Sequence, residues 1–169
     1  MRKIIPILLF VLGFSAFLIY VLYANRERRF PEANMTRLND AETQWYAAGI
    51  QHYQITVEVE FAAERRRHIV TVQNGQVTEA TLSYLVGETW TPPEPVGAEF
   101  AGEFTVPGLF NALRFELNQR QREDVRVDMN VSPAYPRYMY FGPVWLEGEP
   151  MASSEARFTV VAFVPLSAP

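Results

Sequence analysis

The strict alternation of apolar and polar residues from Tyr53 to Phe61 constrains the fold of this chain more than any other feature of its sequence. Because successive side chains of a strand point to opposite faces of a sheet, this pattern predicts an antiparallel strand with one buried face and one wet face. Just before it, Ala41 and Trp45 stand at helical spacing, and Gly49 supplies a stop. We therefore predict that a helix over 40–48 packs Trp45 against the buried face of the strand.

Further strands are predicted by the same alternation and by the turns between them. Asn74-Gly75 separates two apolar runs and is typical of a two-residue hairpin turn. Thr105 suits the cap of a second helix, and Pro107 suits its first turn. The segment 86–104 is rich in proline and glycine and is predicted to be a long loop, a kind of segment that is often functional. The predicted strands cover 52–61, 67–73, 76–84, 124–131, 136–141 and 156–164, and the second helix covers 106–120.

The predicted element order after the N-terminal segment is α-β-β-β-α-β-β-β. Runs of hairpin strands interrupted by two helices are typical of an α+β fold. We therefore predict an antiparallel sheet of about six strands with the two helices packed on one face, preceded by an N-terminal transmembrane helix.

That transmembrane helix is predicted from residues 4–24, which form an apolar run without a charge. At about 1.5 Å per residue the run would be roughly 31 Å long, close to the roughly 30 Å of a bilayer's hydrocarbon core. We predict a transmembrane anchor over 1–25, a juxtamembrane linker over 26–37 and a folded domain over 38–169. A cleaved signal peptide is the alternative, but its apolar core usually spans only about 7–15 residues.

Charge is distributed unevenly along the chain. Residues 1–30 carry five basic residues and one acidic residue, whereas the remainder carries ten basic and eighteen acidic residues. An acidic domain disfavours nucleic acid as a partner, because phosphates would repel it. Basic residues flank the apolar run on both sides, so the positive-inside rule nearly ties. The flanking charges therefore leave the orientation open, and basic charge beside an apolar run suits the surface of the cell membrane.

Four segments follow one another in an order that resembles a known family. They read NDAETQWYAAGIQHYQITVEV, HIVTVQNGQVTEA, TVPGLFNAL and VRVDMNVSPAYPRYMYF. Together they resemble a bacterial domain of unknown function, number 6174 in its series, over about residues 38–164. Members of that family often carry cysteines after the first strand, where this chain has FAAERRR. The resemblance implies a topology and an extracytoplasmic setting, and it implies no chemistry.

The sequence does not point to a catalytic residue, a cofactor or a metal site. A metal site needs several converging ligands, and the two histidines, His52 and His68, each stand at the start of a predicted strand without an acidic pair at ligand spacing. Glu58 and Glu60 would lie about 7 Å apart on one strand face, a separation that suits glycoside hydrolysis. A solvated strand face explains this pair as well, because an open face lacks the desolvation that raises a carboxyl pKa.

Two surface features remain as candidate binding sites. The three consecutive arginines over 65–67 suit an anion or lipid headgroup, or else an ordinary charged turn at the edge of a sheet. Residues 135–145 contain five aromatic residues and two prolines, too many for all to be core. The candidate anion patch is Arg65, Arg66 and Arg67, and the candidate protein-contact surface is Tyr135, Pro136, Arg137, Tyr138, Tyr140, Trp145 and Trp90.

These features favour a binding protein over an enzyme. We predict a membrane-anchored extracytoplasmic domain that binds another protein as an accessory subunit of a membrane complex. The alternative is a tethered domain that binds a small ligand or a lipid, which would require a cavity of about 300 Å³ or more. An enzyme is the weakest hypothesis, because it would need a buried and perturbed titratable group in a cleft.

Overall fold

The computed structural model describes residues 14–21, 27–119 and 121–167. The chain divides into two compact units, one ending at Pro31 and one beginning at Glu32. In the first unit a helix covers 14–21 and a 3-10 turn, η1, covers Glu27–Arg29. The second unit holds the sheet and the remaining helices.

The predicted N-terminal transmembrane helix is wrong. Within the described ranges, no helix is long and apolar enough to cross a membrane. Residues 4–13 and 22–24 of the predicted span lie outside the described residues.

The second unit has the predicted α+β class and is built on an antiparallel sheet. The sheet has eight strands rather than about six, because β4 and β5 were not predicted. From edge to edge the strand order is β4-β3-β2-β1-β10-β7-β6, and β5 pairs with β3. A separate two-stranded hairpin, β8–β9, follows β7. The strands are β1 (Tyr53–Phe61), β2 (Glu64–Gln73), β3 (Gln76–Val86), β4 (Thr89–Trp90), β5 (Glu94–Pro95), β6 (Val125–Val131), β7 (Ala134–Phe141), β8 (Val144–Leu146), β9 (Glu149–Met151) and β10 (Ala156–Pro165).

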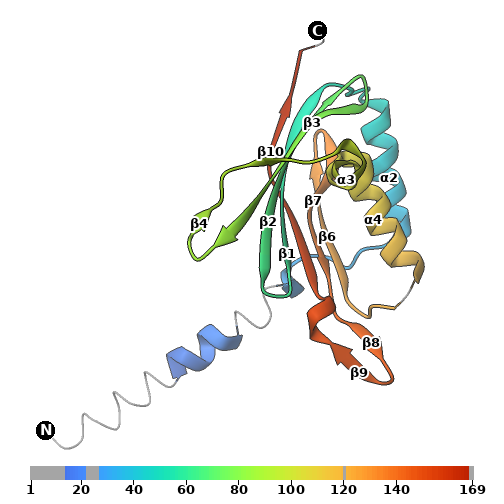
Figure 1. Cartoon of the computed structure of the whole chain (residues 1–169). Helices are drawn as coiled ribbons and strands as arrows, with labels where there is room; N and C mark the ends of the chain where they lie inside the picture. The colour runs from blue at the N-terminus through green and yellow to red at the C-terminus, as the bar shows by residue number, and fades with distance from the viewer. Residues whose placement is uncertain (1–13, 22–26, 120, 168–169) are drawn as a thin grey trace, which may run out of the picture. The chain divides into compact units, whose positions relative to one another are not determined.

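Helices cover one face of this sheet, as Figure 1 shows for α2 and α4, which lie beside each other. The alternation in β1 decides which face, because Tyr53, Ile55, Val57 and Val59 are buried and face the helices. The Asn74-Gly75 turn forms as predicted, with both residues at positive φ. The helical elements are α2 (Met35–Ala47), α3 (Ala98–Ala101), η2 (Gly102–Phe104), α4 (Val106–Gln119) and η3 (Ala152–Ser154).

The core lies between α2, α4 and the sheet. Leu38, Leu109 and Leu113 are fully buried there. The predicted packing of Trp45 is confirmed, because its ring meets that of Tyr53 edge-to-face with centroids 5.5 Å apart. An edge-to-face pair adds about 0.5–1.5 kcal/mol to the free energy gained by burying the rings.

Three features of the structure differ from the predictions. Helix α2 begins at Met35 rather than near residue 40, because the side chain of Asn34 accepts the Arg37 amide at 2.9 Å and caps it earlier. The predicted loop 86–104 contains the short elements β4, β5, α3 and η2. Hairpin β8–β9 was not predicted at all, since strands of three residues offer too few positions for an alternation to be recognised.

Candidate functional site

The predicted aromatic surface is divided between the core and the solvent. Tyr135, Pro136 and Tyr140 are buried in β7. Their neighbour Arg137 is exposed and donates from its Nε to Asp128 at 3.0 Å. The structure therefore does not bring the whole set together, and the role of its exposed members as a protein-contact surface stays a prediction. Tyr138 is half-buried on the same strand, Trp90 lies on β4 across the sheet, and Trp145 lies on β8.

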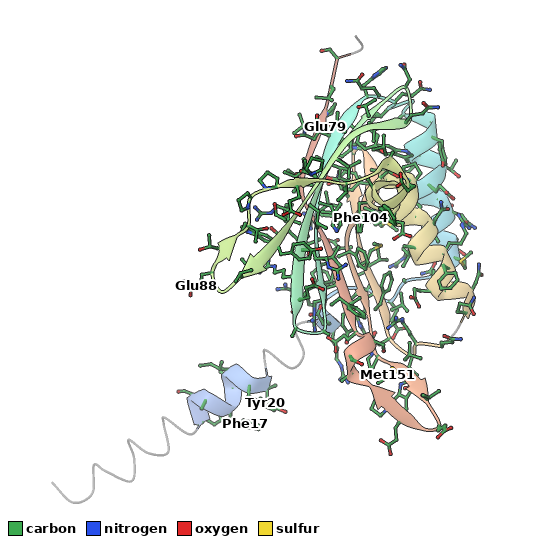
Figure 2. The ribbon with its side chains drawn as sticks, in the orientation of Figure 1. Phe17, Tyr20, Glu79, Glu88, Phe104 and Met151 are labelled. Atoms are coloured by element: carbon green, nitrogen blue, oxygen red, sulfur yellow. The ribbon has the colours of Figure 1, made fainter. Side chains whose placement is uncertain are left out.

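Hairpin β8–β9 displays its large apolar side chains to solvent. Trp145 is 43% exposed, Leu146 58% and Met151 41%. Figure 1 shows the hairpin projecting from the end of the sheet, and Figure 2 shows Met151 upon it. The strands meet in a two-residue turn, Glu147-Gly148, in which both residues have positive φ. No residue of the two short strands is buried, so the hairpin contributes little to the core.

Arg122 fixes this hairpin to the body of the domain. Its Nη1 donates to the carbonyl oxygen of Ser154 at 2.7 Å and to that of Gly142. Its Nε donates to Glu116 on α4 at 2.8 Å, and both charged side chains are largely buried. The Val144 amide in turn donates to the Ser154 hydroxyl at 2.7 Å. A two-stranded hairpin is marginal by itself, so these bonds hold the displayed side chains in place.

The three consecutive arginines fall on opposite faces of the sheet. Arg65 and Arg67 lie on the helix-free face, where each donates to Glu58 at 2.6 Å. The Arg67 guanidinium also lies 3.9 Å from the ring centroid of Trp90, a cation–π contact. Arg66 lies on the helix-covered face beside Glu64. The alternation of β2 thus separates the predicted anion patch, and its role in anion binding stays a prediction.

An open groove of about 710 Å³ lies between α4 and the ends of β1, β7 and β10. Phe61 and Phe115 stand at its rim, 46% and 60% exposed. Gly108 permits the close approach that shapes one end, because a Cβ there would stand 2.2 Å from the Gly102 carbonyl oxygen. The remaining lining is Glu99, Glu103, Asn111, Ala112, Glu116, Arg122, Phe141, Ala156 and Phe158.

A smaller cavity of about 200 Å³ adjoins this groove and contains His68. The two spaces share Phe61, Glu103, Ala156 and Phe158. The imidazole of His68 stacks on the Phe104 ring with centroids 3.6 Å apart. Figure 2 shows Phe104 beside the helices. Burial, and then the nearby charge of Arg66, lower the pKa of His68 from 6.5 to about 4. The imidazole is therefore neutral at physiological pH.

Acidic residues do not assemble into a metal site in the described parts of the chain, where no group of three or more potential ligands converges. Glu60 accepts from Arg157 of β10 at 3.2 Å, and Glu58 is held by two arginines. Both carboxylates of the glycoside hypothesis therefore lie in ion pairs with arginines of neighbouring strands, the arrangement of cross-strand structural pairs.

The sequence profile of DUF6174, a family of unknown function, matches residues 37–162. The chain belongs to this family. The match confirms the resemblance stated from the sequence and covers almost the same residues. No curated protein matches this DUF6174 chain.

Two solved structures show a weak similarity to the DUF6174 chain. One is the complex of MucA and MucB from Pseudomonas aeruginosa, with 17% identity and a TM-score of 0.31 over 79% of this chain. The other is MucB in complex with MucA(peri), with 17% identity and a TM-score of 0.31 over 78% of this chain. The chain spans only 58% and 57% of those chains. Scores this low support no statement about a shared fold or function.

Sequence reasoning missed the place of two residues in the candidate sites of this DUF6174 chain. Arg122 follows the second helix as an isolated arginine, and nothing local shows that it bonds to carbonyls about 20 and 32 residues away. The burial of His68 could have been predicted, because Val70 and Val72 follow it at alternate positions and all three side chains share one face of the strand.

Proposed function

We propose that this DUF6174 domain binds another protein through hairpin β8–β9. The observation that carries the proposal is the exposure of Trp145, Leu146 and Met151 on one anchored hairpin. Tryptophan and methionine are enriched at protein interfaces, and tryptophan is a common hot spot. Because the anchoring bonds already hold the hairpin, less conformational entropy is lost on binding than for a mobile loop. The extracytoplasmic setting expected from the family resemblance stays part of this proposal.

The charge of the hairpin indicates the kind of partner. Glu147 lies in the turn and Glu149 begins β9, so both carboxylates stand beside the apolar side chains. Residues 31–169 carry eighteen acidic and ten basic residues, so the domain as a whole repels acidic surfaces. A partner surface that is apolar at its centre and basic at its rim complements the hairpin in both respects.

Photo-crosslinking tests the proposal in cells that make the full chain. A photoreactive phenylalanine analogue replaces Trp145, and in a matched control it replaces Tyr46, which is 60% exposed on α2. We expect position 145 to yield an adduct with one protein and position 46 to yield none. Equal adduct patterns at the two positions would contradict a hairpin-directed interface.

Affinity for the partner identified in this way supplies the quantitative test. Trp145→Ala should weaken binding by roughly 30-fold or more, the loss of a hot spot worth about 2 kcal/mol. Tyr46→Ala should bind like the wild type. Both variants should melt at the wild-type temperature, because both side chains are exposed. Wild-type affinity in the Trp145 variant would refute the assignment of the hairpin as the interface.

A further inference from the structure

The cavity beside His68 contains polar groups that the surrounding protein does not satisfy. His68 is only 6% exposed, yet neither ring nitrogen has a hydrogen-bond partner among the described protein groups. The same holds for the buried Nε of Arg66. Leaving a buried polar group unpaired costs about 1–3 kcal/mol. A phenylalanine at position 68 would avoid that cost, so stability alone does not explain a histidine there.

The stacking contact covers one face of the imidazole. Phe104 lies against that face at 14° between the ring planes, and both nitrogens, at the ring edge, have no described protein partner beside the cavity that His68 lines. A neutral imidazole offers one donor and one acceptor. The Nε of Arg66, two residues away on the same strand face, offers a second donor.

The adjoining groove supplies an apolar surface that continues from this polar end. Phe61, Ala156 and Phe158 line both spaces, and Phe115 and Phe141 extend the groove along α4. Its volume of about 710 Å³ lies within the range of about 300–1,000 Å³ that is usual for small-molecule sites. An apolar chain in the groove would leave its polar head beside the imidazole.

Charge decides the nature of that head group. Glu64 already pairs with the guanidinium of Arg66, and Glu103 lines both spaces with no basic partner among the described residues. An anionic head would therefore meet an uncompensated carboxylate. An ammonium head has no acceptor, so it would leave the Nε donor of Arg66 unpaired. A neutral hydroxyl or carbonyl can accept from Arg66 and His68 without either penalty.

We propose that the groove and the cavity together bind an uncharged amphiphile. Its chain lies between α4 and the sheet, and its hydroxyl or carbonyl head is hydrogen-bonded by His68 and Arg66. This site does not include the apolar side chains of hairpin β8–β9. The proposal of an amphiphile site is therefore independent of whether the hairpin binds a protein. The competing occupant of the polar cavity is water alone, which can also satisfy buried polar groups.

Titration of the full chain with decanol, decanoate and decylammonium separates these occupants. The three probes have the same chain and differ only in the charge of the head. Nitrogen-detected NMR of the two imidazoles reports the site directly, because the chain has only two histidines. We expect decanol to bind saturably and shift the His68 resonances while those of His52 stay in place. Decanoate and decylammonium should each bind at least about tenfold more weakly, the loss of about 1.4 kcal/mol.

Two variants distinguish the polar end from the apolar groove. His68→Phe keeps an aromatic ring against Phe104 and should weaken the binding of decanol about tenfold. The control His52→Phe should bind decanol like the wild type. Ala112→Leu narrows the groove and should weaken all three probes. Non-saturable uptake, equal shifts of both histidines, equal affinity for charged and neutral heads, or wild-type affinity in His68→Phe would each overturn the proposal. The NMR measurement on the wild type keeps the test decisive if a variant does not fold.

Discussion

Replacing His68 with phenylalanine should remove a large part of the acid sensitivity of this domain. The folded state holds the imidazole neutral, with its pKa lowered from 6.5 to about 4 by burial and by Arg66. The unfolded chain therefore binds a proton more tightly than the folded chain does. Stability from this group is fully present above about pH 6.5 and is lost as the pH falls toward about 4.

The size of this effect follows from the two pKa values. Each tenfold difference in proton affinity is worth about 1.4 kcal/mol. His68 is only 6% exposed, so solvent screens this difference little. The wild type should lose about 3 kcal/mol of unfolding free energy from this histidine between about pH 7 and about pH 4. The variant lacks the titrating group and should be the more stable protein at either pH.

Urea unfolding across this pH range measures the difference. Carboxylates also titrate there, so the informative quantity is the wild-type free energy minus that of His68→Phe at each pH. That difference should change by about 3 kcal/mol, while His52→Phe should follow the wild-type curve. Parallel curves for the wild type and His68→Phe would refute the assignment of a buried neutral imidazole.

Three further substitutions test other parts of the structure. Gly108→Ala should destabilise the domain by about 1–3 kcal/mol in thermal melts, because the added Cβ would overlap the Gly102 carbonyl oxygen. This loss should appear although alanine is the better helix former by about 1 kcal/mol. Arg122→Met should lower the free energy of unfolding by about 3 kcal/mol. It should also accelerate amide hydrogen exchange more in β8–β9 than in β1–β3, and equal acceleration in both regions would contradict an anchoring role. Tyr53→Phe should cost about 1 kcal/mol by removing the acceptor of the Val106 amide. Burial raises the Tyr53 pKa to about 12, so this variant should also lose less stability than the wild type as the pH rises through that value.

The parts of the fold that the sequence predicted are those encoded by neighbouring residues. The alternation over 53–61, the Asn74-Gly75 turn and the start of α4 at Val106 each depend on contacts within a few positions. Local signals also gave the buried place of Trp45, since a helix followed at once by a half-apolar strand has one apolar surface available for packing.

The candidate sites were harder to predict because they depend on contacts between distant segments. The groove forms where Phe61 ends β1 and Ala156 begins β10, residues that are paired in the sheet but 95 positions apart in the chain. The hairpin is positioned by Arg122, whose acceptors follow β7 and β9. No periodicity in the sequence reports these pairings.

Glu58 and Glu60 show how the register of the sheet decides between chemistry and structure. Alternation alone places both carboxylates on one strand face, where they resemble a catalytic pair. On β2, the register places Arg67 opposite Glu58 and Arg65 opposite Glu60. On β10, it places Arg157 opposite Glu60. Cross-strand pairs of opposite charge stabilise a sheet by about 0.2–1 kcal/mol each. The two glutamates thus join three strands on the helix-free face, and the polar groups without such partners, at His68 and Arg66, lie on the other face.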